Sequence, residues 1–463
     1  MKAIPQLDML FKPASVAVVG ASNNRFKTGH RFLSGLINGY YKGKVYAVNP
    51  REAEIEGLVG YPRLVDIPAT VDLAIIAVPA PTVPQVVEDC VQSGVKFAIV
   101  HSAGFAELGN DGSVLQEKIV EIISRGDTRI IGPNCMGLYC PEAGINTITS
   151  ISSTSEDLGG VAFIGQSGWV TENVLLLGHE HGLRFSKVLS IGNQSDLTIE
   201  DLLAYLGNDG DTDIIGLYVE GLKRANEFLP LAKEVSRKKP VVVWKAGRTE
   251  EGAKATTSHT GSIAGNALAF DAAIRQSGLI AAKNLEEMID LLVGFSSPVL
   301  PRGDKLGLLV EAGGGAVASA DAATALGFKL PILSEEIQHG LKIILENVIP
   351  TYGAPRNPVD IVWGPSSARS QFFVQCAQEI LKEVDALLLV HYGVYDDDYA
   401  QGMSKLRDST RKPILIVPGH HSRSREGMNL LTRNGIPSFA IPERALSTLA
   451  AMRQYSNYLQ SVT

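Results

Sequence analysis

The chain has 463 residues, of which 45% are hydrophobic and 20% are charged, and its formal net charge at pH 7 is −7. A chain of this length is expected to fold as two to four domains, because single hydrophobic cores stop growing at about 250–300 residues. The acidic balance and the lack of a long Lys/Arg run argue against binding of nucleic acid. No apolar segment reaches the roughly 18 residues of a membrane helix, so we expect no membrane insertion.

The N-terminal segment MKAIPQLDMLFKP lacks the apolar region and the cleavage site of a secretion signal. The four cysteines, Cys90, Cys135, Cys140 and Cys376, have no spacing typical of a metal site, and we expect buried thiols. A weaker alternative is that Cys135 and Cys140 form a disulfide or a ligand pair. Together these features favour a cytoplasmic location.

Strand-like segments rich in Val, Ile and Ala alternate with amphipathic segments along the first 140 residues. The expected strands lie in segments 15–22, 44–50, 72–79, 97–104 and 129–134. Near-continuous apolar strands that alternate with helices predict a parallel sheet with both faces covered. The looser segment 140–160 is the first candidate for a linker.

Two further units repeat the order of apolar strand, small-residue turn and helix. Their expected strands lie in segments 160–168, 187–193, 213–221 and 239–247, and then in 305–316, 385–394 and 412–419. The Pro/Gly-rich segment 296–304 separates the two units. We therefore predict an α/β fold with domains at 1–140, 141–297 and 298–463.

The turn GASNNRFKTG, residues 20–29, follows the first strand and leads into a helix. Such a turn presents backbone N–H groups and the positive end of the helix to a phosphate. It does not match G-x-G-x-x-G, because Ser22 and Arg25 occupy the third and sixth positions. The turn therefore predicts binding of a phosphorylated ligand without the dinucleotide fingerprint.

The second strand ends in Asn49, Pro50 and Arg51, where a dinucleotide-binding domain has an acidic residue for the ribose. The missing carboxylate and the added cations Arg25, Lys27 and Arg51 favour a nucleotide with an extra phosphate. Coenzyme A fits this description, and NADP fits it less well. The alternative is that these cations are solvated side chains at helix ends.

His259 lies in the loop ATTSHTGSIAGN, residues 255–266, where small residues allow a close approach. No second His or Cys lies at ligand spacing, so we expect no metal site there. The segment GQSGW, residues 165–169, resembles the nucleophile elbow of a serine hydrolase only in part, because Trp169 replaces the last Gly. A hydrolase that uses Ser167 therefore stays an alternative.

Segments 165–178 and 310–327 both read as a strand end, a Gly-rich turn and a helix. Two helix N-termini can together stabilise one anion, each by roughly 0.3–2 kcal/mol. A phosphorylated His259 between them would be a covalent intermediate that splits one difficult transfer into two easier ones. Glu220, at a predicted strand end, is the candidate for holding the other ring nitrogen, although it could be an ordinary strand-end carboxylate.

Several motifs occur in one order along the chain: LFKPASVAVVGAS, AVNP, GPNCMG, FIGQSG, SIGNQSD, YVEG, SHTGSIAG and EAGGGAVASAD. In this order the chain resembles the nucleoside-diphosphate-forming acyl-CoA synthetases, a family that includes archaeal-type ADP-forming acetyl-CoA synthetases and, more distantly, succinyl-CoA synthetase. The resemblance covers essentially the whole chain. It implies a CoA-binding Rossmann domain followed by two flavodoxin-like domains with doubly wound parallel sheets.

The resemblance also implies roles for single residues. His259 matches the phosphorylated histidine and Glu220 the carboxylate that steadies it. Gln166, Ser167 and Gly168 match the first phosphate-binding turn, and Gly313, Gly314, Gly315 and Ala316 match the second. CoA-contacting segments of the family fall on Gly20, Ala21, Ser22, Arg25, Asn49, Pro50, Val78, Pro79, Ser102 and Ala103. Asn193 and Asp196 lie in a family motif to which no contact is assigned.

The family also needs an ATP-grasp domain for ADP or ATP and Mg²⁺, and the three predicted units leave no space for one. The resemblance therefore implies a separate ATP-grasp beta subunit and an α2β2 heterotetramer. The implied reaction is acyl-CoA + ADP + phosphate ⇌ acid + ATP + CoA, with His259 carrying the phosphoryl group on a mobile loop. The alternatives are a CoA-binding regulatory module without catalysis and an NADP-dependent oxidoreductase.

Overall fold

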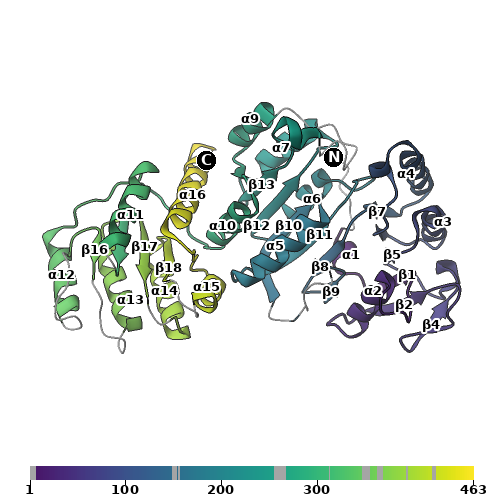
Figure 1. The fold of residues 1–463 in the computed structure, drawn as a ribbon, viewed down its shortest axis with the longest axis horizontal. Coiled ribbons are helices and arrows are strands. Elements are labelled where there is room, and N and C mark those ends of the chain that lie inside the picture. Colours follow the sequence, from purple (N-terminus) through teal and green to yellow (C-terminus); the bar gives the residue numbers. More distant parts are fainter. Residues whose placement is uncertain are drawn as a thin grey trace. The chain divides into compact units, whose positions relative to one another are not determined.

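A computed structural model describes residues 7–148, 154, 157–254, 267–311, 313–346, 355–361, 369–392, 395–419 and 424–462 (Figure 1). His259 and its loop lie outside the described residues. The chain forms two compact units. Unit 1 comprises residues 1–176 and 184–283, and unit 2 comprises residues 177–183 and 284–463.

The first sheet of unit 1 has the strand order β3-β4-β2-β1-β5-β6-β7. The strands are β1 (Ser15–Val19), β2 (Lys44–Val48), β3 (Glu54–Ile55), β4 (Leu58–Tyr61), β5 (Leu73–Ile76), β6 (Phe97–Val100) and β7 (Arg129–Ile131). All neighbours pair in parallel except β3 with β4. The helices are α1 (Asp8–Phe11), α2 (Thr28–Ile37), α3 (Val83–Gln92) and α4 (Asn110–Ile123), with short 3-10 turns at Leu64–Asp66, Ala80–Thr82 and Ala106–Leu108. All five strands predicted in this region are confirmed, and the antiparallel pair β3–β4 was not predicted.

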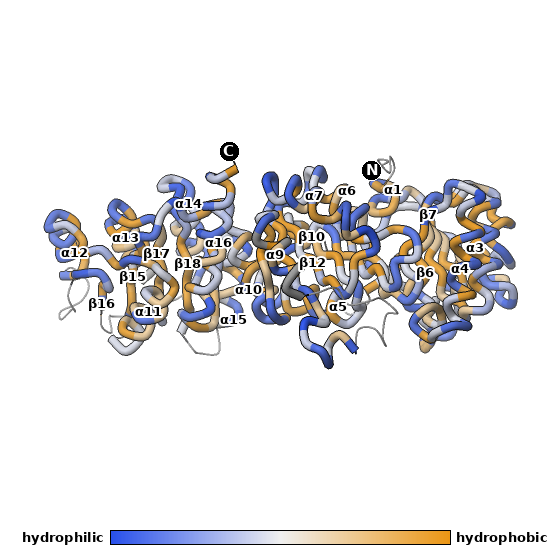
Figure 2. Tube along the Cα trace, turned by 90° about the horizontal axis from the view of Figure 1, so that it is seen from above, coloured by the Kyte–Doolittle hydropathy of each residue, from blue (hydrophilic) through white to orange (hydrophobic). Residues whose placement is uncertain are grey.

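The second sheet of unit 1 has the strand order β14-β13-β12-β10-β11-β8-β9. The strands are β8 (Gly137–Cys140), β9 (Ile145–Asn146), β10 (Leu158–Gly165), β11 (Phe185–Ser190), β12 (Ile214–Val219), β13 (Val241–Lys245) and β14 (Ile280–Ala282). Helices α5 (Gly168–Glu180), α6 (Ile199–Leu206), α7 (Ala225–Val235) and α9 (Ala267–Ser277) accompany them. Every residue of β11 and β12 is buried, as expected for strands covered on both faces, and Figure 2 shows the hydrophobic colour along β10 and β12.

The predicted linker at 140–160 contains regular structure that belongs to the second sheet. β9 lies inside it, and β10 begins within it at Leu158. β8 pairs antiparallel with β11, so Gly137–Cys140 joins the second sheet although we placed it in the first domain. Part of the predicted linker therefore belongs to the second sheet, and the chain passes from β7 of the first sheet to β8 of the second through residues 132–136.

Unit 2 contains a parallel sheet with the order β16-β15-β17-β18. The strands are β15 (Leu306–Val310), β16 (Val359–Asp360), β17 (Ala386–His391) and β18 (Ile414–Pro418). The helices are α10 (Leu285–Phe295), α11 (Gly313–Ala325), α12 (Glu335–Glu346), α13 (Arg369–Ile380), α14 (Asp397–Thr410), α15 (Ser424–Arg433) and α16 (Pro442–Val462). Helix α10 belongs to this unit although it precedes the expected boundary at residue 298.

Two general expectations can be compared with the structure. All four cysteines are buried free thiols, as predicted. Within the described ranges, no helix is both long and apolar enough to span a bilayer.

Candidate functional site

The predicted CoA-contacting residues lie at one edge of the first sheet. β2, β1, β5 and β6 are adjacent and parallel, so the segments that follow them emerge side by side. β2 and β5 lie on opposite sides of β1, so the order of the strands reverses direction at β1. Open α/β sheets bind ligands at such a switch point. Ser102 Oγ donates to the carbonyl of Val78, and the N–H of Asn134 donates to the carbonyl of Ser102 at 2.9 Å. The structure therefore brings the segments after these four strands together.

Two glycines of the turn 20–29 stand where a side chain would collide with backbone. Gly20 has a φ of +92°, and a Cβ there would overlap the carbonyl oxygen of Ala77. A Cβ on Gly29 would overlap the carbonyl oxygen of Gly20. These contacts place the first turn of α2 directly against the end of β1, which is the arrangement that phosphate-binding turns use.

The carboxylate of Glu52 organises the same turn. It accepts hydrogen bonds from Ser22 Oγ at 2.8 Å and from the backbone N–H of Asn23 at 2.9 Å. The hydrogen bond from the Asn23 backbone, followed by that from Ser22, lowers the pKa of Glu52. Asn49 Nδ2 donates to the carbonyl of Ala21 at 2.7 Å and so braces the turn from the other side.

Glu52 corrects one step of the sequence argument. We inferred that no carboxylate follows the second strand, because Asn49 and Arg51 occupy the expected positions. In the structure the carboxylate of Glu52 lies beside the turn, and Lys27 contributes to its lowered pKa. The charge balance near the turn therefore does not by itself favour an extra phosphate. Arg25 is exposed, and its contact with a ligand stays a prediction.

The predicted phosphate-binding turn joins β10 to α5. Gly168 begins the helix, and the first-turn amides of Gly168 and Trp169 have no acceptor among the described residues. The N–H of Val170 faces Ser167 Oγ at 3.4 Å, and Thr171 Oγ1 donates to the Ser167 carbonyl at 2.7 Å. The turn thus presents a helix N-terminus of the kind that binds anions.

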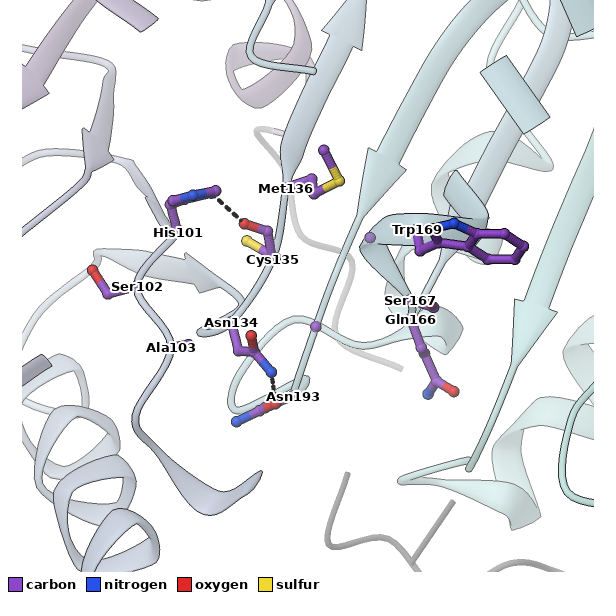
Figure 3. Close-up of a pocket in the computed structure, with 12 residues that line it drawn as sticks. His101, Ser102, Ala103, Asn134, Cys135, Met136, Gln166, Ser167, Trp169 and Asn193 are labelled. Carbon is purple, nitrogen blue, oxygen red and sulfur yellow. Dashed lines mark hydrogen bonds between the residues drawn. The ribbon is translucent and has the colours of Figure 1, made fainter. Parts of the chain in front are cut away.

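The side chain of Gln166 is directed elsewhere. Its Nε2 donates to the carbonyl of Gly221 at 2.6 Å, and its Oε1 accepts from the backbone N–H groups of Glu220 and Gly221. The backbone N–H of Gln166 lies 3.3 Å from the carbonyl of Tyr218. Figure 3 shows the amide pointing away from the other labelled residues. These donors serve the protein, so the geometry does not favour Gln166 as a direct ligand of phosphate.

Glu220 directly follows β12 and is 6% exposed. Lys245 Nζ donates to its backbone carbonyl at 2.9 Å. Burial lowers the pKa of Lys245, and Glu220 partly opposes that shift. Burial and the neighbouring Glu220 raise the pKa of Tyr218. The carboxylate is therefore held in a polar but largely desolvated setting.

A pocket of about 370 Å³ joins the two parts of the site (Figure 3). Its walls come from the segments after β6, β7, β10 and β11. The lining residues are His101, Ser102, Ala103, Asn134, Cys135, Met136, Gln166, Ser167, Gly168, Trp169, Gly192 and Asn193. The cavity therefore connects the edge of the first sheet after β6 and β7 with the N-terminus of α5.

Sequence reasoning gave no site role to several residues of this pocket, and His101 and Met136 are two of them. His101 Nδ1 lies 2.7 Å from the carbonyl of Cys135, and since a carbonyl only accepts, Nδ1 carries the proton. Burial lowers the pKa of His101 and favours the neutral ring. Met136 lies against Gly168, where a Cβ would meet its Cγ at 2.6 Å. His101 lies in the expected strand segment 97–104 and Met136 in the motif GPNCMG, but nothing in the sequence marks their side chains as pocket walls.

The motif with Asn193 and Asp196 acquires a structural role. Asp196 accepts from Arg129 Nη2 at 2.8 Å and from the backbone N–H of Ile130 at 2.8 Å. Asn193 Nδ2 donates to Glu107 Oε2 at 2.6 Å. These bonds fasten the loop after β11 to the first sheet, so the motif holds two walls of the pocket together.

The second predicted phosphate turn lies in unit 2, at the N-terminus of α11. Gly313 and Gly314 are exposed, whereas Ala316 is buried. A Cβ on Gly313 would come within 3.3 Å of Asp360 Oδ2, so this helix end has a carboxylate nearby. The expected meeting of the two helix ends around His259 stays a prediction. Within the described part of the chain, no group of three or more His, Cys, Asp and Glu side chains could hold a metal ion.

Comparisons with known proteins agree with this geometry. Residues 14–141 match the CoA binding domain family, and residues 158–295 match the succinyl-CoA ligase-like flavodoxin domain family. The chain is 36% identical over 457 residues to the alpha subunit of acetate–CoA ligase (ADP-forming) II of Pyrococcus furiosus, with 97% of each chain covered. The chain belongs to the ADP-forming acetate–CoA ligase family.

The chain is also similar to a longer protein of this family and to one whose structure has been solved. It is 38% identical to acetate–CoA ligase (ADP-forming) I of Archaeoglobus fulgidus, where it spans 64% of that protein's length. The structure matches an acetyl-coenzyme A synthetase 1 of Candidatus Korarchaeum cryptofilum, solved in complex with phosphate and ADP, with a TM-score of 0.87 and 33% identity. That match covers 99% of both chains, so the α/β fold with a CoA-binding domain and flavodoxin-like domains is confirmed.

Proposed function

We propose that the chain is the alpha subunit of an ADP-forming acetate–CoA ligase and that it catalyses acyl-CoA + ADP + phosphate ⇌ acid + ATP + CoA. The pocket between the CoA edge of the first sheet and the N-terminus of α5 carries this proposal. It allows a thioester and a phosphate to meet while both are held by backbone of one compact unit. The two matched domain families lie on the same two sheets.

The first steps involve bond exchange at the acyl carbon and then at phosphorus. An oxygen of phosphate attacks the thioester carbonyl, the C–S bond breaks, and the CoA thiolate takes up a proton. His259 then attacks phosphorus of the acyl phosphate, and the P–O bond to the acyl group breaks to release the acid. The helix end at Gly168 stabilises the phosphate charge through backbone N–H groups that are already oriented.

The phosphoryl group finally passes from His259 to ADP. We assign ADP, ATP and Mg²⁺ to a separate ATP-grasp beta subunit in an α2β2 complex, in which Mg²⁺ would neutralise phosphate charge. Support comes from the relatives: the chain covers 97% of an alpha subunit but 64% of the Archaeoglobus protein. The buried free thiols fit a reducing, cytoplasmic location.

Labelling with γ-³²P-ATP in the presence of Mg²⁺ and a candidate beta subunit tests the proposal. We expect acid-labile label on the wild-type chain and none on His259→Ala. Because the carrier must be a neutral imidazole, labelling should fall at acid pH. Equal labelling of the wild type and of His259→Ala would count against the proposal. CoA binding by the wild type without any label would favour the non-catalytic CoA-binding module.

A further inference from the structure

Gln166 occupies a position that connects the phosphate turn to the carboxylate behind it. Its backbone directly follows β10 and leads into the N-terminus of α5. Its side chain crosses to the neighbouring strand β12, which pairs with β10 in parallel up to Gly165 and Tyr218. One residue therefore belongs to the turn through its backbone and reaches the Glu220 segment through its side chain.

The amide of Gln166 binds this segment at three points. Oε1 accepts from the N–H of Gly221 at 3.0 Å and also from the N–H of Glu220. Nε2 donates to the carbonyl of Gly221 at 2.6 Å. Gln166 is 7% exposed and Glu220 is 6% exposed, so little water competes for these hydrogen bonds. The arrangement fixes the backbone from which the Glu220 carboxylate projects.

We propose that Gln166 is a positioning residue that orients Glu220 for the phosphoryl transfer to His259, rather than a ligand of phosphate. The inference rests on the proposed function. A nucleophilic imidazole needs one nitrogen unprotonated toward phosphorus and the other N–H held by a carboxylate. In the proposed function Glu220 supplies that carboxylate, so a change in its position should lower the rate of transfer without weakening phosphate binding.

The two roles predict different kinetics. A phosphate ligand contributes to binding, and its loss raises the concentration of acyl phosphate needed for half-maximal rate. A positioning residue contributes to the transition state, and its loss lowers the maximal rate while the half-saturating concentration stays nearly constant. The Gln166→Met variant separates these cases, because methionine has a similar length and makes none of the three hydrogen bonds.

Gln194 provides a matched control. Its Nε2 also donates to the carbonyl of Gly221, at 3.4 Å, but its Oε1 accepts from Ile199 and not from Glu220. The Gln194→Met variant thus removes the same side-chain type and a contact with the same carbonyl. It leaves the hydrogen bond to the N–H of Glu220 in place.

The test measures transfer of label from ³²P-acetyl phosphate to the full chain as a function of concentration. We expect Gln166→Met to lower the maximal labelling rate roughly 10- to 100-fold, the range found when residues that orient metal-binding side chains are replaced. The half-saturating concentration should change less than about threefold, and Gln194→Met should label within about threefold of the wild type. CoA binding by each variant reports whether unit 1 is folded.

Each other outcome has a clear meaning. A wild-type rate in Gln166→Met, or a raised half-saturating concentration at an unchanged maximal rate, overturns the inference but leaves the proposed function standing. Absence of label on the wild type, or label that survives His259→Ala, overturns both. If Gln166→Met loses CoA binding, Gln166→Glu replaces it, since its carboxylate still accepts from the Glu220 and Gly221 N–H groups. Because that variant keeps the bond to the Glu220 N–H, its half-saturating concentration should stay within about threefold of the wild type, and a raised half-saturating concentration at an unchanged maximal rate would overturn the inference.

Discussion

At the residue scale, Glu52 shows how one carboxylate determines the shape of a binding turn. Its two oxygens accept from Ser22, from both the backbone and the side chain of Asn23, and from Asn49. These donors belong to the turn after β1 and to the end of β2. A single charge therefore fixes the geometry in which the turn meets a ligand, without itself being a ligand for an anion.

The first prediction concerns the charge of Glu52. The pKa of Glu52 is lower in the folded chain than in the unfolded chain. The Glu52 carboxylate therefore stabilises the fold at a pH above the unfolded pKa, and this stabilisation is lost as the pH falls through the folded pKa. We expect Glu52→Gln to speed amide hydrogen exchange at Ser22–Asn24 roughly three- to tenfold at pH 7. The difference from the wild type should shrink as the pH falls through the lowered pKa of Glu52.

Glu54→Gln is the matched control for this prediction. Glu54 lies two residues after Glu52, its side chain is exposed, and its replacement removes the same charge. Its exchange rates at Ser22–Asn24 should stay close to those of the wild type. Equal acceleration in both variants would mean that net charge, and not the Glu52 hydrogen bonds, orders the turn.

At the element scale, the packing of α2 on the end of β1 depends on the absence of one side chain. A methyl group on Gly29 would overlap the carbonyl oxygen of Gly20, which belongs to backbone and cannot rotate away. Gly35 lies in the same helix, and a methyl group there would meet the carbonyl of Asn146 at an ordinary 3.5 Å.

We therefore expect Gly29→Ala to displace α2 from the turn and to weaken CoA binding at least about tenfold, as a backbone clash requires movement of the whole helix start. Gly35→Ala should bind CoA normally, and alanine's higher helix propensity should add up to about 1 kcal/mol to stability. Isothermal titration with CoA measures both variants. Normal affinity in Gly29→Ala would show that the turn does not contact the ligand.

The loop after β11 supports a further prediction at this scale. The Asp196 side chain is 14% exposed and binds Arg129 through both carboxylate oxygens. Burial of Arg129 lowers the pKa of its guanidinium, but the hydrogen bonds and charge of Asp196 outweigh this effect and raise it. Asp196→Asn should reduce the stability of unit 1 by about 1–3 kcal/mol, since an arginine is left partly buried without its counter-charge.

Thermal unfolding checks this prediction, with the transition of unit 1 recognised by its upward shift when CoA is added. Glu121→Gln serves as control, because it breaks an exposed pair between Glu121 on α4 and Arg125 just after the helix, with an expected effect of about 0.5 kcal/mol or less. An equally small effect of Asp196→Asn would mean that the backbone bonds between the loop and β7 suffice to hold the pocket wall.

At the scale of the whole molecule, the parts that could be predicted are those fixed by local pattern. Apolar runs such as 214–219 predicted buried parallel strands, and small-residue turns after them predicted the binding edge. The antiparallel pairs β3–β4 and β8–β9 were missed, because their short strands lie among Gly, Pro and Glu residues and not in an apolar Val/Ile run. The partners of Glu52, Gln166 and His101 depend on contacts between distant segments, which no spacing along the chain encodes.

The division into two compact units leads to the last prediction. In unit 2 the carboxylate of Asp290 on α10 receives two hydrogen bonds from Arg444 on α16, at 2.7 and 2.8 Å. Burial raises the pKa of Asp290 even though Arg444 opposes the shift, so the pair is largely removed from water. Asp290→Asn leaves the partly exposed Arg444 with only the exposed Glu286 as its partner, and it should destabilise unit 2 by roughly 1–3 kcal/mol.

CoA binding by unit 1 should stay within about twofold of the wild type in this variant, because the proposed CoA residues lie wholly in the other unit. Glu286→Gln is the control: Glu286 also faces Arg444, at 3.6 Å, but its side chain is 77% exposed and its loss should cost less than about 1 kcal/mol. Calorimetry with and without CoA separates the two transitions. If Asp290→Asn abolished CoA binding along with the unit 2 transition, the two units would have to fold as one cooperative body, and the assignment of CoA binding to an independent unit 1 would be wrong.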